Sequence, residues 1–231
     1  MRYKKASITQ RLHLPSTCVL CQQYHRGSLA VCQLCIGLFK QLGPACHYCA
    51  LPLPDAEFLI CGLCAKERPV FDSVLTAYAF EEPLRTLLHN FKYQGALYLR
   101  SFLIQLMLDA LPLLTTSAQC LIPVPLHAKR LQQRGFNQAA ELARLLAKKL
   151  KLPCDFKLCK KIIHTAPQAS LDSKQRQQNL HQAFQSKTTS YQHVILVDDL
   201  LTTGSTANEL ARVLKRQGVS RVDLWCCART V

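Results

Sequence analysis

Apolar runs and helix-patterned stretches alternate along the chain from residue 73 onward. Short apolar runs predict buried strands at residues 73–80, 120–124, 193–197 and 222–227. Between them, apolar residues recur at the spacing of amphipathic helices, at residues 83–93, 97–111, 135–151 and 205–217. The segment 164–182 is polar without a sustained period, which predicts a mobile loop passing into a short helix. Strands that alternate with helices are typical of a parallel sheet flanked by helices, so we expect an α/β fold.

The hydrophobic pattern predicts no membrane span. The longest apolar stretch, residues 102–114, is interrupted by Gln105, Asp109 and Pro112. A membrane helix needs about 20 mostly apolar residues, so this stretch is a predicted core helix. The first 15 residues are basic, but no apolar block follows them, and they do not have the form of a secretory signal. We therefore expect a cytoplasmic protein.

Eight of the thirteen cysteines stand in four Cys-x-x-Cys pairs before residue 65. A gap of two residues lets both thiolates of a pair turn toward one tetrahedral zinc ion, and two pairs complete a site. In a cytosolic chain, metal binding is favoured over disulfides. The pattern therefore predicts two zinc ions, whose ligands are Cys18, Cys21, Cys32, Cys35, Cys46, Cys49, Cys61 and Cys64. Four sulfur ligands leave no open coordination position, which is typical of structural zinc, and His47 is then not needed as a ligand.

The way in which the four pairs combine is left open by the spacing. Neighbouring pairs would give two successive zinc ribbons, and alternating pairs would give a cross-brace. The short intervals between neighbouring pairs favour successive ribbons. With a boundary in the sequence Lys66-Glu67-Arg68-Pro69, we expect an N-terminal extension at residues 1–17, a double zinc ribbon at 18–67 and the α/β domain at 68–231. The five other cysteines lie in apolar surroundings and are predicted core residues.

The bend between the strand at 193–197 and the helix at 205–217 carries a specific pattern. It has four apolar residues, two aspartates, two leucines and then Thr-Thr-Gly-Ser-Thr, over residues 194–206. Backbone N–H groups and hydroxyls of residues 202–206 can surround a phosphate at the N-terminus of the helix. Two adjacent acids would repel a phosphate, so Asp198 and Asp199 predict ribose hydroxyls and a Mg²⁺ ion as partners. A threonine-rich helix cap is the alternative, but the complete order of residues favours phosphate binding.

These thirteen residues resemble the fingerprint with which type I phosphoribosyltransferases bind 5-phosphoribosyl 1-pyrophosphate (PRPP). The resemblance implies a parallel sheet flanked by helices, with a hood and a flexible loop. It implies that Asp198 and Asp199 contact the ribose hydroxyls, and it makes Asp199 a candidate general base. It also implies that the 5-phosphate is bound by Thr202, Thr203, Gly204, Ser205 and Thr206.

From Cys18 to Arg229 the chain is similar to the ComF family, also called the GntX group, which pairs a double zinc ribbon with this transferase domain. Besides the cysteine pairs and the bend, the resemblance is carried by Phe91-Lys92-Tyr93, Pro123-Val124-Pro125, Arg134-Gly135-Phe136-Asn137-Gln138 and Ala183-Phe184. The founding role of the family is natural competence, the uptake of single-stranded DNA into the cytoplasm. The resemblance therefore implies other competence or DNA-processing proteins as partners.

Several basic residues are candidates for binding the pyrophosphate group of PRPP, because arginine forks suit diphosphate oxygens. By its position, the turn after residues 120–124 resembles the pyrophosphate loop, so Arg130 and Arg134 are candidates there, and Arg134 joins the two aspartates as a catalytic candidate. Lys92 is a ligand candidate through the Phe-Lys-Tyr match. Arg176 lies in the segment that resembles the flexible loop and is a candidate for closing over the ligand.

The distribution of charge adds a second candidate partner. Residues 121–193 hold 13 basic and 3 acidic side chains, a net charge of +10 out of +15 for the chain. A solvated helix face explains such a bias, and so does an anionic partner. One hypothesis is an active phosphoribosyltransferase in nucleotide salvage or other metabolism, without DNA binding. Because no base-selecting hood is recognisable, we expect instead a PRPP-binding competence factor that handles single-stranded DNA, and turnover is left open.

Overall fold

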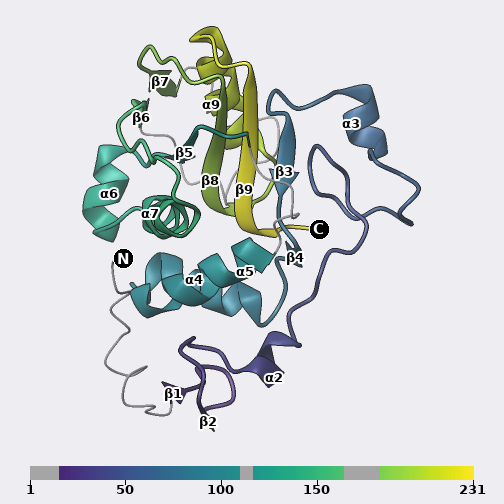
Figure 1. The fold of residues 1–231 in the computed structure, drawn as a ribbon, viewed down its shortest axis with the longest axis vertical. Coiled ribbons are helices and arrows are strands. Elements are labelled where there is room, and N and C mark those ends of the chain that lie inside the picture. Colours follow the sequence, from purple (N-terminus) through teal and green to yellow (C-terminus); the bar gives the residue numbers. More distant parts are fainter. Residues whose placement is uncertain (1–15, 110–116, 164–182) are drawn as a thin grey trace.

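The computed structural model describes residues 16–109, 117–163 and 183–231 (Figure 1). Its centre is a parallel sheet in the order β3-β9-β8-β5, and β4 pairs with β9 next to β3. These strands are β3 (Ser73–Leu75), β4 (Tyr78–Ala79), β5 (Cys120–Pro123), β8 (His193–Leu201) and β9 (Arg221–Arg229). The longest pairing, between β8 and β9, runs in register from His193↔Arg221 to Leu201↔Arg229. The predicted parallel sheet flanked by helices is confirmed.

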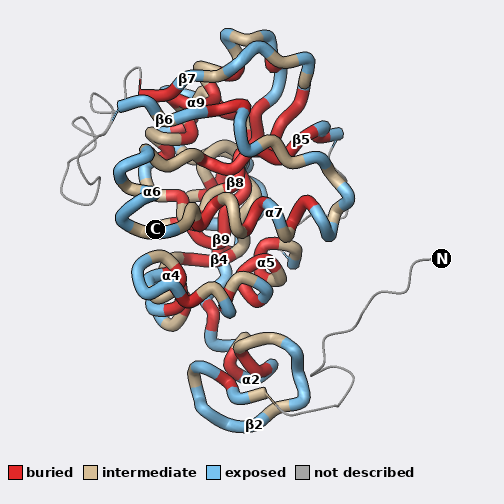
Figure 2. The backbone as a smooth tube through the Cα atoms, turned by 90° about the vertical axis from the view of Figure 1, so that its left-hand side faces the viewer, coloured by how far each residue is buried: buried red, intermediate tan, exposed pale blue. Residues whose placement is uncertain are grey.

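Each face of the sheet is covered by helices, which explains why its strands read as continuous apolar runs. Ile195 and Val197 of β8 face one core, and Val194 and Leu196 face the other. The first core is closed by α4 (Leu84–Tyr93), η1 (Leu97–Leu99), α5 (Arg100–Asp109) and α7 (Gln138–Leu150). The second is closed by α9 (Ser205–Arg216) with β6 (Cys159–Lys161) and β7 (Phe184–Ser186). Figure 2 shows the sheet strands as buried along most of their length.

Several elements differ in extent from the predicted ones. The strand predicted at 73–80 is two short strands, because the carbonyl oxygen of Ala77 accepts a bond from the N–H of Leu42. The helix predicted at 135–151 starts later, at Gln138, and a separate helix, α6 (Ala128–Arg134), precedes it. Gly135, at φ 82°, ends α6, and the Asn137 side chain caps α7 by accepting bonds from two N–H groups. In the sheet, β8 and β9 both run beyond their predicted ends.

The antiparallel hairpin of β6 and β7 was not predicted, because both strands are short and partly polar. The hairpin flanks the segment 164–182, whose predicted loop and helix lie outside the described residues. None of the helices in the described ranges combines the length and the hydrophobicity of a membrane span.

The N-terminal region docks on the sheet domain at two separate places (Figure 1). Its first half, with β1 (Ser16–Thr17), β2 (Tyr24–His25) and α2 (Gln33–Ile36), lies next to α4 and α5, where the ring of Phe39 packs 5.5 Å from that of Phe102. Its second half, with α3 (Gly62–Lys66), lies beside β3, where Val74 N–H donates to the carbonyl oxygen of His47 at 3.2 Å. The domain boundaries stay predictions.

Candidate functional site

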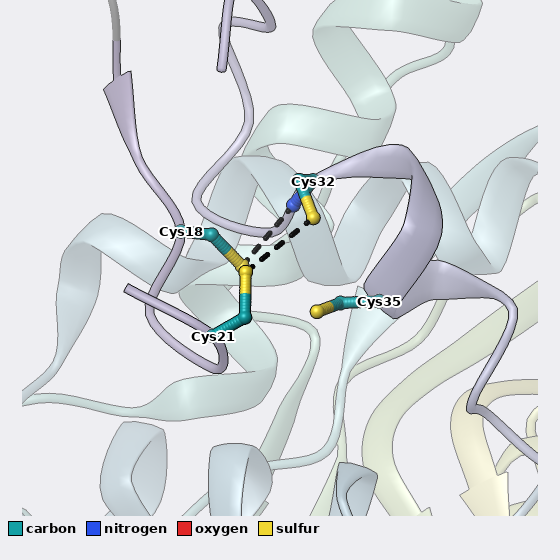
Figure 3. Close-up of side chains that lie close together, drawn as sticks. All are labelled: Cys18, Cys21, Cys32 and Cys35. Atoms are coloured by element: carbon teal, nitrogen blue, oxygen red, sulfur yellow. Dashed lines mark hydrogen bonds between the residues drawn. The ribbon is translucent and has the colours of Figure 1, made fainter. Parts of the chain in front are cut away.

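The eight paired cysteines form two groups of four (Figure 3 shows the first). Neighbouring pairs combine, so the described structure has successive ribbons and not a cross-brace, and His47 belongs to neither group. Within each group all sulfur atoms lie within 4.8 Å of one another. The Sγ atoms of Cys21 and Cys32 are 3.8 Å apart, and those of Cys49 and Cys61 are 3.6 Å apart. Tetrahedral zinc with bonds of about 2.3 Å needs sulfur atoms about 3.8 Å apart, so both groups fit a structural zinc ion.

Backbone N–H groups donate to a sulfur atom in each of the two clusters. Cys32 N–H donates to Cys18 Sγ at 3.4 Å, and Cys64 N–H donates to Cys61 Sγ at 3.5 Å. Burial opposes ionisation of Cys18, but N–H groups such as that of Cys32 outweigh it and lower the pKa to about 6. Zinc binds the thiolate, so at Cys18 these donors favour the ligating form.

The five other cysteines are core residues, as predicted. Cys120, Cys159, Cys226 and Cys227 are buried and Cys154 is half-buried. Burial raises the pKa of Cys154 and of Cys226 to about 12. Thiols with such a pKa are poor nucleophiles at neutral pH, so these residues serve packing.

Asp198 and Asp199 lie near the carboxyl end of strand β8 and not in the turn that follows it. Asp199 is only 3% exposed, and its Oδ2 lies 3.1 Å from Nζ of Lys92, which comes from the last turn of α4. Gln138, the first residue of α7, donates from Nε2 to Asp199 Oδ1 at 3.5 Å. Asp198 accepts the N–H of Asp199 at 2.9 Å. Three elements distant in sequence therefore meet at one carboxylate.

The pKa values of the two acids are shifted in opposite directions. Burial opposes ionisation of Asp199, but the charge of Lys92 together with hydrogen bonds from Asp198, Lys92 and Gln138 outweighs it, so the pKa of Asp199 is lowered. The charge of Asp199 in turn raises the pKa of Lys92 against the effect of burial. At Asp198, burial and the neighbouring carboxylate raise the pKa well above its usual value. The pair therefore offers an ionised acceptor beside a carboxyl group that can also donate, which suits the hydroxyls of a sugar.

The turn after β8 brings the backbone to the N-terminus of α9. Gly204 has φ 78°, and a Cβ placed on it would lie 3.3 Å from Cε1 of Phe71. Only glycine fits this left-handed, crowded position without strain. Thr203 Oγ1 lies 2.8 Å from Ser205 Oγ and accepts the N–H of Ser205 at 3.4 Å. The first N–H groups of α9 and its dipole make this turn suited to an anion.

A cleft of about 370 Å³ joins the acids and the turn. Its walls include residues 124–126 after β5, the side chains of α6, and the β6–β7 hairpin. Arg134 Nη1 donates to Gln138 Oε1 at 2.6 Å, and the guanidinium carbon lies 5.1 Å from the centre of the Tyr93 ring. Arg134 is therefore fixed by an amide and an aromatic ring.

Most of the predicted ligand residues line this one cleft. They are Lys92, Arg130, Arg134, Asp198, Asp199, Thr202, Gly204, Ser205 and Thr206. Thr203 is exposed beside the cleft and contacts Ser205. Arg176 lies outside the described residues.

Sequence reasoning missed several polar residues of the cleft, among them Gln138, Lys161 and Thr230. The position of Gln138 in the Arg-Gly-Phe-Asn-Gln motif was a signal that could have identified it. In the sequence, Lys161 is one of the 13 basic residues of the segment 121–193 and has no further distinguishing pattern. Burial, with a smaller contribution from Arg130, lowers the pKa of Lys161 to about 8. Lys161 and Arg130 therefore lie near each other in the lining of the cleft.

Comparisons with known proteins agree with this arrangement. Residues 133–230 match the family model described as a phosphoribosyl transferase domain. The chain is 34% identical to competence protein F of Haemophilus influenzae, over 92% of this chain and 96% of the relative. It is 31% identical to the DNA utilization protein YhgH of Salmonella typhimurium, over 95% of this chain and the whole relative, and 28% identical to competence protein ComFC of Bacillus subtilis, over 81% and 79%.

The sheet and the cleft thus define a phosphoribosyltransferase-type domain, preceded by cysteine clusters compatible with zinc ribbons. The chain belongs to the ComF family of competence and DNA-utilization proteins.

Proposed function

We propose that this protein is a cytoplasmic competence factor that binds PRPP with Mg²⁺ in its cleft and handles incoming single-stranded DNA. The proposal rests on one observation. Asp198 and Asp199, the glycine turn at the N-terminus of α9 and several cations all line one cleft. The names of the relatives, competence protein F and DNA utilization protein YhgH, support the DNA-related role.

Each part of PRPP has a chemical counterpart in the cleft. The 5-phosphate fits the turn at residues 202–206, where N–H groups and hydroxyls gather at the start of α9. The ribose hydroxyls fit Asp198 and Asp199, and the diphosphate fits the wall with Arg130 and Arg134. The volume of about 370 Å³ lies in the range of small-molecule sites, about 300–1,000 Å³.

The donor set fits a Mg²⁺ ion that enters with the ligand. Lys92 and Gln138 already compensate Asp199, so the described cleft offers few free carboxylate oxygens. Mg²⁺ is commonly held by one or two carboxylates together with substrate phosphates. Asp198 is the protein ligand we propose: the ion would displace the proton that its raised pKa favours and would neutralise charge on the diphosphate.

An active phosphoribosyltransferase is the second candidate function. Arg130 and Arg134 line the wall where a departing diphosphate needs positive charge. Asp199 is the candidate base for the acceptor, although its ion pair with Lys92 lowers its pKa and makes it a weak one. The acceptor would be a base or another nucleophile.

Calorimetric titration of PRPP with Mg²⁺ into the full chain tests the shared proposal, and pyrophosphate detection with a panel of nucleobases then separates the two functions. Binding without pyrophosphate release supports the binding factor. Release that depends on one nucleobase supports the enzyme. If no heat of binding is found at millimolar PRPP, a PRPP site in this cleft is ruled out.

The charge state of Lys161 makes PRPP binding depend on pH. Its pKa of about 8 means that the amine is charged below pH 8 and neutral above it. PRPP phosphates stay ionised in this range, since their second pKa is about 6. We expect PRPP affinity to fall about ten-fold between pH 7 and pH 9, because only the charged amine attracts the diphosphate. In Lys161→Met this decrease should be absent. A wild-type affinity that is constant over the same range would contradict a role for Lys161.

Single-stranded DNA binding should be driven by charge. The exposed cations of the described part of segment 121–193 are Lys129, Arg144, Lys148, Lys149, Lys151, Lys157, Lys160 and Lys187. The exposed aromatic ring among them, Phe156, is covered by the guanidinium of Arg144 at 5.2 Å. Stacking therefore contributes little, and affinity should follow the number of phosphates neutralised.

We expect the triple variant Lys148→Gln/Lys149→Gln/Lys151→Gln to bind DNA less tightly and with a smaller salt dependence. Each lost phosphate contact lowers the log–log salt slope by about 0.7, so the slope should fall by about 2. Fluorescence anisotropy with a labelled oligonucleotide at several salt concentrations measures both quantities. Arg26→Gln/Lys66→Gln/Arg216→Gln removes the same charge at exposed positions outside the segment. Equal slopes for the two triple variants would show that the segment is not the DNA-binding surface.

A further inference from the structure

The carboxyl end of β9 connects the second cysteine cluster to the phosphate turn. Arg229, the last residue of β9, is 8% exposed. Its Nε donates to the carbonyl oxygen of Cys49 at 2.8 Å, and its Nη1 donates to the carbonyl oxygen of Leu201 at 3.3 Å. Cys49 belongs to the second metal site, and Leu201 directly precedes the turn at residues 202–206. One guanidinium therefore spans both sites.

Arg229 also holds a residue that lines the cleft. Its Nη1 donates to the carbonyl oxygen of Thr230 at 2.5 Å and to Thr230 Oγ1 at 2.8 Å. Thr230 N–H in turn donates to the carbonyl oxygen of Leu201 at 3.0 Å. Because the planar guanidinium makes these bonds in fixed directions, it ties Cys49, Leu201 and Thr230 to one another.

A second connection runs through the segment between α3 and β3. Val70 N–H donates to Oδ1 of Asn208, in the first turns of α9, at 2.8 Å. Phe71 is 2% exposed, and its ring lies against Gly204 of the turn, 3.3 Å from where a Cβ would stand. Val70 and Phe71, which follow the second cluster along the chain, therefore contact the phosphate turn and the start of α9.

The first cysteine cluster lies elsewhere. Cys18, Cys32 and Cys35 are part of the core that α4 and α5 close. The segment that follows them contributes Phe39, whose ring packs against Tyr78 and Phe102. The two clusters therefore have different neighbours, which gives the chain an internal comparison.

Charge also favours a link between Arg229 and the second cluster. A zinc ion with four thiolates carries net negative charge, and the guanidinium lies against the backbone of one of these ligands. A buried cation is tolerated where its hydrogen bonds are satisfied and opposite charge is near. Zinc at this cluster would therefore help to hold Arg229 in its position.

We propose that zinc binding at the second cluster and ligand binding at the phosphate turn are thermodynamically coupled, and that Arg229 is the positioning residue that links them. Filling the metal site orders the carbonyl oxygen of Cys49, which holds Arg229 and, through it, the end of β8. By linkage, a ligand on the turn tightens zinc binding by the same factor. The ligand half of this statement rests on the proposed PRPP site, whereas the ordering of the turn by zinc does not.

Amide hydrogen exchange of residues 201–208, measured on zinc-loaded full chain, tests the ordering. Cys61→Ser removes one thiolate from the second cluster, and Cys21→Ser is the matched change in the first. We expect exchange about ten-fold faster in Cys61→Ser, within the usual range of coupling between sites, and a clearly smaller change in Cys21→Ser. Arg229→Met keeps all eight thiolates, so it tests the link itself, and we expect it to accelerate exchange as much as Cys61→Ser.

Calorimetry with PRPP and Mg²⁺ gives the second readout, and we expect affinity losses in the same order. Equal exchange in the two cysteine variants, or wild-type exchange in Arg229→Met, would overturn the coupling. If Cys61→Ser does not fold, the exchange rates of Arg229→Met and Arg229→Lys decide. Lysine cannot reach both carbonyl oxygens, so we expect both variants to exchange faster than the wild type. If Cys61→Ser and Arg229→Met exchange faster but the wild-type protein does not bind PRPP, the ordering of the turn by zinc is supported. Only the proposed ligand is then overturned.

Discussion

Asp198→Asn/Asp199→Asn is expected to bind PRPP at least 100-fold more weakly than the wild-type protein. Both carboxyl groups line the cleft, and Asp199 is held in place by Lys92 and Gln138. A hydrogen bond to a charged group contributes about 1.5–3 kcal/mol, and two such losses amount to at least a 100-fold change. Calorimetric titration with PRPP and Mg²⁺ measures the loss directly.

The single variants should divide this effect unequally. Because burial and the charge of Asp199 raise the pKa of Asp198, the cost of removing its proton offsets part of what an ionised Asp198 contributes to binding. We expect the smaller loss from Asp198→Asn and the larger one from Asp199→Asn. Glu57→Gln/Glu67→Gln removes two exposed charges away from the cleft and should bind PRPP like the wild type. A double aspartate variant with wild-type affinity would contradict the assignment of the ribose site.

Lys92→Met is expected to lower the free energy of unfolding by about 3 kcal/mol at pH 7. It removes the partner of a carboxylate that is almost completely buried, and breaking such a pair costs about 3–5 kcal/mol. The lower end applies because the Lys92 side chain is 25% exposed. Urea unfolding followed by fluorescence of Trp225, a core residue, measures the change.

The pH dependence of this loss has a definite sign. The lowered pKa of Asp199 gives stability that is present above its unfolded pKa, about 3.9, and is lost as pH falls through its folded pKa. The raised pKa of Lys92 gives stability that is present below about pH 10 and is lost as pH rises through its folded pKa. The difference between wild type and Lys92→Met should therefore be largest near neutral pH and shrink in acid.

A double-mutant cycle separates the ion pair from simple loss of packing. Adding Asp199→Asn to Lys92→Met removes the unpaired charge, so the double variant should be more stable than Lys92→Met alone. If the double variant is the less stable of the two, or if Lys92→Met costs under 1 kcal/mol at every pH, the ion pair does not support the fold.

Local patterns predicted the parts of this protein whose chemistry lies within a few consecutive residues. The Cys-x-x-Cys pairs place two sulfur atoms beside each other in any turn that they adopt, so the zinc ligands could be recognised without a fold. The turn at 202–206 could be recognised for the same reason, since a strand, a glycine and a helix start follow directly along the chain. Its strand was predicted too short, because a polar pair at 198–199 hides the continuation of β8 to Leu201.

The long-range contacts of the cleft could not be predicted in this way. Lys92, Gln138 and Asp199 are far apart in sequence, and their meeting depends on how α4 and α7 pack on the sheet. Lys161 belongs to a hairpin too short to leave a periodic signal. Its lowered pKa arises from burial, which no sequence pattern displays.

By itself, the sequence determined four pairs of thiolates, alternating strands and helices, and a turn suited to phosphate, because each depends on the spacing of neighbouring residues. Tertiary structure alone decided which cation neutralises Asp199, where each cysteine cluster docks, and that Arg229 joins Cys49 to Leu201. The physical reason is that pairing, burial and charge compensation depend on distances in space, and only the packed sheet and its helices set those distances.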